Sequence, residues 1–377
     1  MKKSSAIISA IVLAALIAGA VIALNKPSVS PADSGSNASA NPIVIGAVIS
    51  LTGPAASFGE YAKNGMDLAA SEINAAGGID GRQVRIIYED DQTNPKSAVS
   101  AFTKLTSIDN ANAVIGGLWD FVAQPMLPLA LNSKTTLITP TQFRIEGGFE
   151  FNANSFSMLT DFSKVIRGVT SYLKRDDVQK IAVVHFKSTF GTEIAKTIAQ
   201  VTKEIGKGVI IDEAYTAFDT NDFKTTIAKL KQQHVDTVFL DMVDKDTVNF
   251  LMRSKELGFT SKMITYAGSY DGFTADNRSL LEGITVLNWE ASTPAFIARY
   301  HARFNADSAK SANRSYDAVY VLAEAIAKTG NNADVSSYIE SHAFSTANGP
   351  ITFLPTHQVS TTPVELDTYK NGALIPF

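Results

Sequence analysis

The chain of 377 residues contains no cysteine. This absence excludes a disulfide scaffold, a thiolate metal site and a cysteine nucleophile. It also excludes the lipid-modified cysteine that tethers many exported bacterial proteins. Any attachment of this chain to a membrane must therefore come from the peptide itself.

Basic clusters and catalytic motifs are missing as well. The 33 Lys and Arg residues and the 37 Asp and Glu residues are spread along the chain, and no run of five basic residues occurs. Nucleic-acid binding therefore has no electrostatic footprint. The five histidines share no motif, and neither Gly-x-Ser-x-Gly nor His-Glu-x-x-His occurs. We expect no enzymatic activity, no cofactor and no metal site.

A long apolar run stands near the N-terminus. Lys2 and Lys3 precede Ala6 to Leu24, which carry no charge. This pattern is typical of an export signal that is also long enough to span a bilayer. Cleavage after Ala20 or Ala40 would give a periplasmic or secreted protein, but the length of the run favours an uncleaved anchor over residues 1–24. Both alternatives predict an extracytoplasmic protein.

Residues 25–42 are rich in Ser and Pro and predict a flexible linker. From Ile43 the chain alternates short apolar runs with amphipathic stretches. Predicted strands lie at 43–49, 84–88, 113–116, 135–138, 180–184, 209–211, 237–240 and 262–266. Predicted helices include 121–132, 160–175, 222–233, 246–257, 294–305, 315–328 and 334–341, and residues 366–375 predict a closing hairpin. This order predicts an α/β protein with two doubly wound parallel-sheet lobes and a cleft.

Two loop motifs have simple structural interpretations. Gly77-Gly78 follows a predicted helix, so it predicts a helix end and not a phosphate-binding loop. Asp90-Asp91 follows a strand, and no third oxygen ligand is spaced nearby, so we favour a solvated loop over a cation site.

Short motifs recur in the order and spacing of one known family. They are Ser50-Leu-Thr-Gly-Pro54, Phe58-Gly59, Glu72 to Gly81, Asp90-Asp91 with Asn94-Pro95, Ile115-Gly116, Ile138-Thr-Pro140, Phe190-Gly191, Asp222-Phe223 with Lys229 to Lys231, and Tyr316 to Val319. The chain resembles the leucine/isoleucine/valine-binding type of periplasmic binding protein, the solute receptor of branched-chain amino-acid ABC importers.

This resemblance implies a type I Venus-flytrap fold with three hinge crossings, near residues 158, 289 and 346. Lobe 1 would comprise residues 43–158 plus 289–345, and lobe 2 residues 159–288 plus 346–377. It also implies a small-molecule ligand, an ABC permease as partner and a monomeric receptor. The alternative is a ligand-sensing ectodomain of the same fold that acts through a partner protein. Only residues 1–5 precede the apolar run, so no output domain is expected there.

The resemblance also assigns candidate ligand-binding residues. The serine that binds the α-carboxylate in amino-acid receptors corresponds to Asp120, and the residues after Pro140 are Thr141, Gln142 and Phe143, so a hydroxyl position has become Phe. On the second lobe, a tyrosine of the family corresponds to Val243 and an acidic residue to Gly268 or Ser269. The amino-acid clamp is therefore largely missing from this chain.

Aromatic residues surround these positions. Phe58, Trp119, Phe121 and Phe190 stand at predicted strand ends or helix starts near the cleft. Such residues either pack in the core or form a ligand platform, and both interpretations remain open. One acid among aromatic faces predicts a ligand with an amine, a cation or a hydroxyl group on an apolar or ring body. Free α-amino acids are expected to bind poorly because their carboxylate would face Asp120.

Overall fold

The computed structural model describes residues 41–216, 222–266, 273–274, 276–289, 292–306, 311–330 and 332–377. The predicted anchor over residues 1–24 and nearly all of the predicted linker lie outside these described residues. Within the described residues, no helix is both long and apolar enough to cross a membrane.

The first sheet has five strands in the order β2-β1-β3-β4-β5, and each neighbouring pair is parallel. The strands are β1 (Ile43–Ile49), β2 (Val84–Asp90), β3 (Ala113–Gly116), β4 (Thr136–Thr139) and β5 (Ser155–Ser157). The first four confirm the sequence-based prediction, because strands covered on both faces show as continuous apolar runs. The strand β5 was not predicted, since three residues carry no periodicity.

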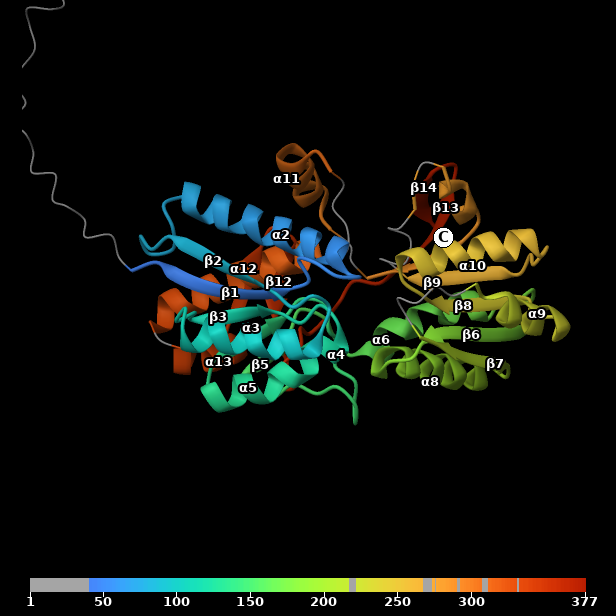
Figure 1. Cartoon of the computed structure of the whole chain (residues 1–377), viewed down its shortest axis with the longest axis horizontal. Helices are drawn as coiled ribbons and strands as arrows, with labels where there is room; N and C mark the ends of the chain where they lie inside the picture. Colours follow the sequence, from blue (N-terminus) through green and yellow to red (C-terminus); the bar gives the residue numbers. More distant parts are fainter. Residues whose placement is uncertain are drawn as a thin grey trace, which may run out of the picture. The chain divides into compact units, whose positions relative to one another are not determined.

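Helices cover both sides of this sheet, and Figure 1 shows α2 on one side and α5 on the other. The helical segments of this part are α2 (Ala56–Ala75), α3 (Pro95–Ser107), α4 (Asp120–Ala123), η1 (Gln124–Met126), α5 (Leu127–Ser133), α11 (Pro294–Phe304), α12 (Ala312–Thr329) and α13 (Asn332–Ser341). The single helix predicted over residues 121–132 is divided into α4, η1 and α5. Pro125 and Pro128 lack the N–H that a continuous α-helix needs at those positions.

The helices α2 and α12 pack closely along each other. Gly65 of α2 makes this approach possible, because a Cβ atom there would lie 2.0 Å from the carbonyl oxygen of Ala312. The helix α2 ends as predicted at Gly77-Gly78, where both residues have positive φ angles of 99° and 83° and Gly78 N donates to Ile73 O.

The second sheet has seven strands in the order β14-β13-β10-β9-β8-β6-β7. The strands are β6 (Lys180–Phe186), β7 (Gly208–Tyr215), β8 (Thr237–Asp241), β9 (Lys262–Tyr266), β10 (Thr285–Asn288), β13 (Glu365–Lys370) and β14 (Ala373–Pro376). The strands β6 to β10 pair in parallel. The strands β13 and β14 form the predicted closing hairpin, and β13 pairs antiparallel with β10. The short strand β10 was not predicted.

The helical segments of the second part alternate with its strands. They are α6 (Phe162–Ile166), η2 (Arg167–Val169), α7 (Thr170–Leu173), α8 (Thr189–Glu204), α9 (Lys224–Gln232), α10 (Asp244–Glu256) and η3 (Arg278–Leu281). The side chain of Ser188 caps the start of α8 by accepting a hydrogen bond from Gly191 N at 2.9 Å. This start of α8 faces the site described below.

A small antiparallel hairpin of β11 (Ala343–Thr346) and β12 (Gly349–Thr352) follows α13. The strand β11 contacts α12, and the ring of His357 stacks on that of Phe156 in β5 with centroids 4.5 Å apart. Pairing with the second sheet begins at Glu365. Residues 343–358 therefore contact elements of the first part.

The solvated loop predicted at Asp90-Asp91 is wrong for Asp91, which is fully buried. Asp91 Oδ1 accepts hydrogen bonds from Ser50 Oγ at 2.6 Å and from Thr93 N at 2.8 Å. Asp90 Oδ1 accepts from Leu51 N at 3.0 Å, and Asp90 Oδ2 accepts from Thr52 Oγ1 at 2.5 Å. The two carboxylates brace the loop between β1 and α2.

Candidate functional site

A pocket lies where the carboxyl ends of strands from both sheets meet, the position at which α/β sheets bind ligands. Eight of the ten predicted site residues line it, namely Phe58, Trp119, Asp120, Thr141, Gln142, Phe143, Phe190 and Val243. Four residues that sequence reasoning missed complete the lining, namely Leu118, Phe186, Tyr266 and Trp289. The cavity measures about 70 Å³, so side chains fill much of the space between the two sheets.

Two predicted residues are not part of this lining. Phe121 lines a neighbouring groove together with Asp120 and stacks on the outer side of Trp119, with ring centroids 6.4 Å apart. Ser269 lies outside the described residues.

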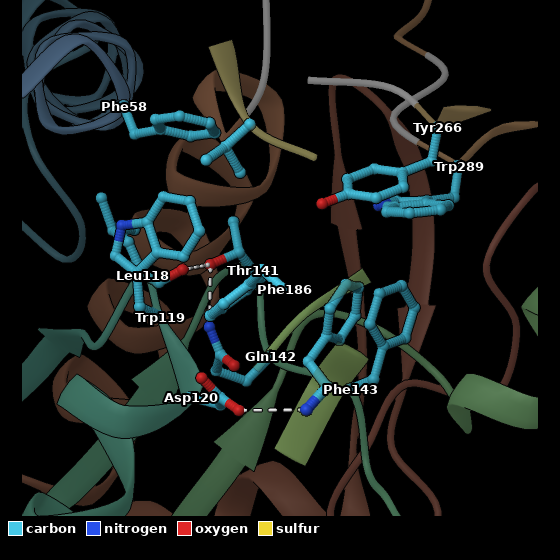
Figure 2. Close-up of a pocket in the computed structure, with 12 residues that line it drawn as sticks. Phe58, Leu118, Trp119, Asp120, Thr141, Gln142, Phe143, Phe186, Tyr266 and Trp289 are labelled. Carbon is cyan, nitrogen blue, oxygen red and sulfur yellow. Dashed lines mark hydrogen bonds between the residues drawn. The ribbon is translucent and has the colours of Figure 1, made fainter. Parts of the chain in front are cut away.

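Seven aromatic rings form most of the wall, and they fall into two groups (Figure 2). In the first group, Phe58 meets Trp119 edge to face at 4.9 Å. In the second group, Tyr266 stacks on Trp289 at 4.9 Å, and Trp289 meets Phe143 edge to face at 5.3 Å. Contacts of this kind stabilise each pair by about 0.5–1.5 kcal/mol beyond the burial of area, so the rings are held in place before a ligand arrives.

Of the described residues that line the pocket, Asp120 alone is charged, and it is 7 % exposed. It opens α4 directly after β3, and its Oδ1 accepts a hydrogen bond from Phe121 N at 2.8 Å. Its Oδ2 accepts from Phe190 N in α8 at 3.1 Å, the bond drawn in Figure 2. Burial raises the pKa of Asp120, although the hydrogen bonds from Phe190 and Phe121 oppose the rise. One carboxylate therefore joins the first sheet to the start of α8.

A second carboxylate, Asp241, lies behind the pocket wall at the end of β8 and is fully buried. Tyr266 Oη donates to Asp241 Oδ1 at 2.8 Å, and Phe186 N donates to Asp241 Oδ2 at 3.3 Å. Burial raises the pKa of Asp241 to about 7, and the negative charge of Asp120 adds to the rise. The two carboxylates therefore repel each other electrostatically across the wall of the pocket.

The remaining polar groups come from the turn after β4. Thr141 Oγ1 donates to Leu118 O at 3.0 Å, and Gln142 Nε2 donates to Thr141 Oγ1 at 3.3 Å. Gln142 lies beside Asp120 at one end of the pocket (Figure 2). This end can exchange hydrogen bonds with a ligand, whereas the phenylalanine rings offer only apolar faces and edges.

The described residues contain no group of three or more His, Asp or Glu side chains arranged to hold a metal ion. The missed residues Phe186 and Tyr266 are the last residues of β6 and β9, and Trp289 follows β10. The strand-end position was the available signal for Phe186 and Tyr266, because both strands were predicted.

Two doubly wound sheets with a pocket at their facing carboxyl ends define the class of two-lobed solute receptors. The sequence model of the periplasmic binding protein family matches residues 42–372, and the chain belongs to this family. The Leu/Ile/Val-binding protein of Escherichia coli K12 is 24 % identical over 327 residues, which cover 83 % of this chain and 87 % of that relative.

Solved structures show the same fold. The branched-chain amino acid binding protein LivJ of Streptococcus pneumoniae in complex with isoleucine matches with a TM-score of 0.80 at 22 % identity, over 88 % of this chain and 97 % of that chain. A solute-binding protein of an ABC transporter from R. palustris in complex with benzoate also has a TM-score of 0.80, at 18 % identity, over 89 % and 95 % of the two chains.

Proposed function

We propose that this protein is the extracytoplasmic solute-binding protein of an ABC importer and holds one small ligand per chain between two lobes. The observation that carries this proposal is the pocket lined from the ends of both sheets in a chain that belongs to the periplasmic binding protein family. Relatives named for leucine, isoleucine and valine binding and structures in complex with isoleucine or benzoate support a ligand of amino-acid or single-ring size.

The proposed ligand is amino acid-like, an amine, an amide or an aromatic compound. Seven rings supply the apolar contact, while Asp120, Gln142 and Thr141 supply hydrogen bonds. The cavity of about 70 Å³ is small for such a ligand. Binding therefore requires the two lobes to separate and then close, which is the hinge motion known for this class of protein.

The lobes proposed from the sequence need one adjustment. The first sheet with residues 292–358 would form lobe 1, and residues from about 162 to 288 with 365–377 would form lobe 2. The contacts of β11 with α12 and of His357 with Phe156 support a third crossing at residues 359–364 instead of near residue 346. Residues 6–24 would hold the receptor at the outer membrane face, and N-terminal sequencing of the exported protein tests this.

The experiment for the receptor function is a thermal-shift screen of amino acids, amines, amides and aromatic compounds, followed by small-angle scattering. A ligand at 100 times its Kd stabilises the protein by about 2.7 kcal/mol. A bound ligand should also reduce the radius of gyration. The proposal fails if no compound stabilises the protein or if saturation leaves the radius unchanged.

Two neighbouring aromatic residues give a matched pair of variants for this experiment. Trp119 lines the pocket, whereas Phe121 stacks on its outer side and does not. Trp119→Leu should weaken the binding of any hit at least tenfold, since a pocket-lining ring is lost, and Phe121→Leu should leave it within about threefold. Equal losses in both variants would place the ligand elsewhere.

A further inference from the structure

The charge pattern of the pocket points to one class within the proposed ligands. Among the twelve described residues that line it, none is Lys, Arg or His, and the only side chain with a formal charge at neutral pH is the carboxylate of Asp120. A buried carboxylate is costly unless a cation or several donors compensate its charge. The described residues supply backbone N–H groups but no cationic side chain at this place.

The donors to Asp120 are backbone N–H groups, so hydrogen bonds and no ion pair stabilise its charge in this part of the chain. Asp241 lies close enough for its charge to interact with that of Asp120. The basic groups beside the pocket have other partners: His185 Nε2 lies 3.1 Å from Asp212 Oδ1, and Arg314 donates to Trp289 O at 3.4 Å. Lys187 lines the outer groove without an ion pair to Asp120. Among the described lining residues, the one formal charge is therefore negative.

Among the described residues, an anionic ligand has no cationic partner in this pocket. The start of α8 would attract an anion, because its backbone N–H groups point toward the site. Asp120 Oδ2 already accepts the hydrogen bond from Phe190 N at that position. A ligand carboxylate would have to displace Asp120 and would then leave a second carboxylate beside it.

The aromatic rings of the pocket wall provide a second attraction for a cation, in addition to the carboxylate of Asp120. Ring faces carry negative potential and attract a cation within about 6 Å of the ring centre, most strongly where water is excluded. Trp119 and Tyr266 lie on opposite sides of the pocket, as Figure 2 shows. Tyr266 Oη donates a hydrogen bond to Asp241 Oδ1, so toward a ligand this oxygen can act as a hydrogen-bond acceptor.

We propose that the pocket takes an organic cation, a protonated amine or a quaternary ammonium on a compact apolar or ring body, with Asp120 as its counter-ion and the aromatic rings as its walls. This inference rests on the proposed receptor function and narrows its ligand class. Asp120 also accepts the hydrogen bond from Phe190 N at the start of α8. The ligand cation and this contact between the two parts of the chain would therefore share one carboxylate. A cation at Asp120 would therefore be bound where the two lobes meet.

The test uses five single-ring or amino-acid probes of matched size, namely benzylamine, benzyltrimethylammonium, benzyl alcohol, benzoate and leucine. Calorimetry on the full folded chain should give affinities for both cations that are at least about tenfold above that for benzyl alcohol. Benzoate and leucine should bind more weakly than benzyl alcohol. Tighter binding of benzylamine than of its quaternary analogue indicates a direct hydrogen bond to Asp120, and the reverse order indicates that the rings dominate; both orders support the proposal.

Two variants that each remove one negative charge distinguish an effect of the carboxylate in the pocket from an effect of the protein's net charge. Asp120→Asn keeps an oxygen that can accept from Phe190 N, and it should lower the affinity for benzylamine by about tenfold to a hundredfold. Its affinity for benzyl alcohol should fall by a smaller factor, since a neutral hydroxyl forms a hydrogen bond but no ion pair with the carboxylate. Glu193→Gln, on α8 outside the pocket and beside Lys196, should change neither affinity.

The outcomes distinguish this inference from the receptor function. If benzoate or leucine binds as tightly as benzylamine and reduces the radius of gyration, the cation inference is overturned and the receptor function stands. Equal losses in Asp120→Asn and Glu193→Gln also overturn it. If the five probes and the whole ligand screen leave the melting temperature and the radius unchanged, the receptor function fails and the cation inference fails with it.

Discussion

Two buried aspartates, Asp91 and Asp120, follow the strands that flank β1 in the first sheet, and they differ in where their hydrogen-bond donors come from. Asp91 accepts from Ser50 Oγ and Thr93 N, which belong to the loops next to it. Asp120 accepts from Phe190 N, seventy residues away at the start of α8. Burial raises the pKa of both carboxyl groups.

This difference in donors shows that burial and a strand-end position do not by themselves decide the role of a carboxylate. Asp91 stabilises the fold of one part of the chain, because both donors come from the same corner of the first sheet. Asp120 connects the ends of two sheets inside a pocket, because one of its donors belongs to the second part. Loss of Asp91 should therefore affect folding, whereas loss of Asp120 should affect closure and ligand binding.

The largest expected effect is the loss of stability in Asp91→Ala. The buried hydroxyl of Ser50 and the N–H of Thr93 lose their acceptor, which costs about 2–4 kcal/mol of the free energy of unfolding. Urea denaturation of the ligand-free protein measures this loss. Asp176→Ala, at an exposed carboxylate, is the control and should change stability by less than about 0.5 kcal/mol. A loss below 1 kcal/mol in Asp91→Ala would contradict its role as a brace.

A third buried carboxylate, Asp241 on the second sheet, extends the comparison to the dependence of stability on pH. Its pKa is about 7 in the folded protein, above the value of about 3.9 for an unfolded chain. The folded state therefore binds more protons between these values, and this group lowers stability as the pH rises from about 4 to about 7. The slope is at most about 1.4 kcal/mol per pH unit.

Asp241→Asn should remove this slope. Between pH 5 and pH 7.5 the wild type should lose on the order of 2 kcal/mol of stability that the variant retains, apart from the contributions of other groups that both proteins share. Denaturation at the two pH values measures the difference. Parallel pH profiles for the two proteins would show that Asp241 does not titrate in this window.

Much of the fold was predictable because the strands of a covered parallel sheet are apolar runs between amphipathic helices. The missed strands β5, β10, β11 and β12 each have only three or four residues. The equally short β3 and β4 were predicted from their place in the alternation of strands and helices at the start of the folded chain. The conformation of the missed strands depends on partners elsewhere, as when β10 pairs with β9 on one side and β13 on the other. Local sequence does not contain that information.

Asp120 and Phe143 were predicted because the family resemblance places ligand-binding residues in the turns after two of the strands, and Trp119 was predicted as the aromatic neighbour of Asp120. The rings of Phe186 and Tyr266 were missed although their strands were predicted, because the last side chain of a strand points to one of two faces and the sequence does not specify which. The bond from Phe190 N to Asp120 had no sequence signal, since backbone groups carry none.

A smaller effect on stability is expected for Asp120→Ala. The variant loses an acceptor at the start of α8, which costs about 1 kcal/mol. The ligand-free protein should shift toward a more open arrangement, because this bond joins the two parts. Small-angle scattering should give a larger radius of gyration for Asp120→Ala than for Asp120→Asn, which keeps an accepting oxygen. Equal radii for the two variants would show that the bond does not hold the lobes together.

The smallest expected effect on stability concerns Asp90, whose pKa is shifted in the opposite direction to that of its neighbour Asp91. Partial burial favours a higher pKa for Asp90, but hydrogen bonds from Thr52 Oγ1 and from the N–H groups of Gln92, Thr52 and Leu51 outweigh it, and the pKa is lowered. A lowered folded pKa gives stability that is present above about pH 4 and is lost as the pH falls through the folded value.

The raised pKa of Asp91 acts in the opposite direction, because protonation relieves the burial of its charge as the pH falls. Acidification from pH 5 to pH 3 should therefore cost the wild type more stability than it costs Asp90→Asn. Since Asp90 remains partly accessible to solvent, this difference should be only a few tenths of a kcal/mol. For Asp91→Asn the difference should have the reverse sign: acidification should cost the wild type less stability than it costs this variant. Urea denaturation at the two pH values measures both differences. Differences of the same sign in the two variants would refute the contrast between these adjacent carboxylates.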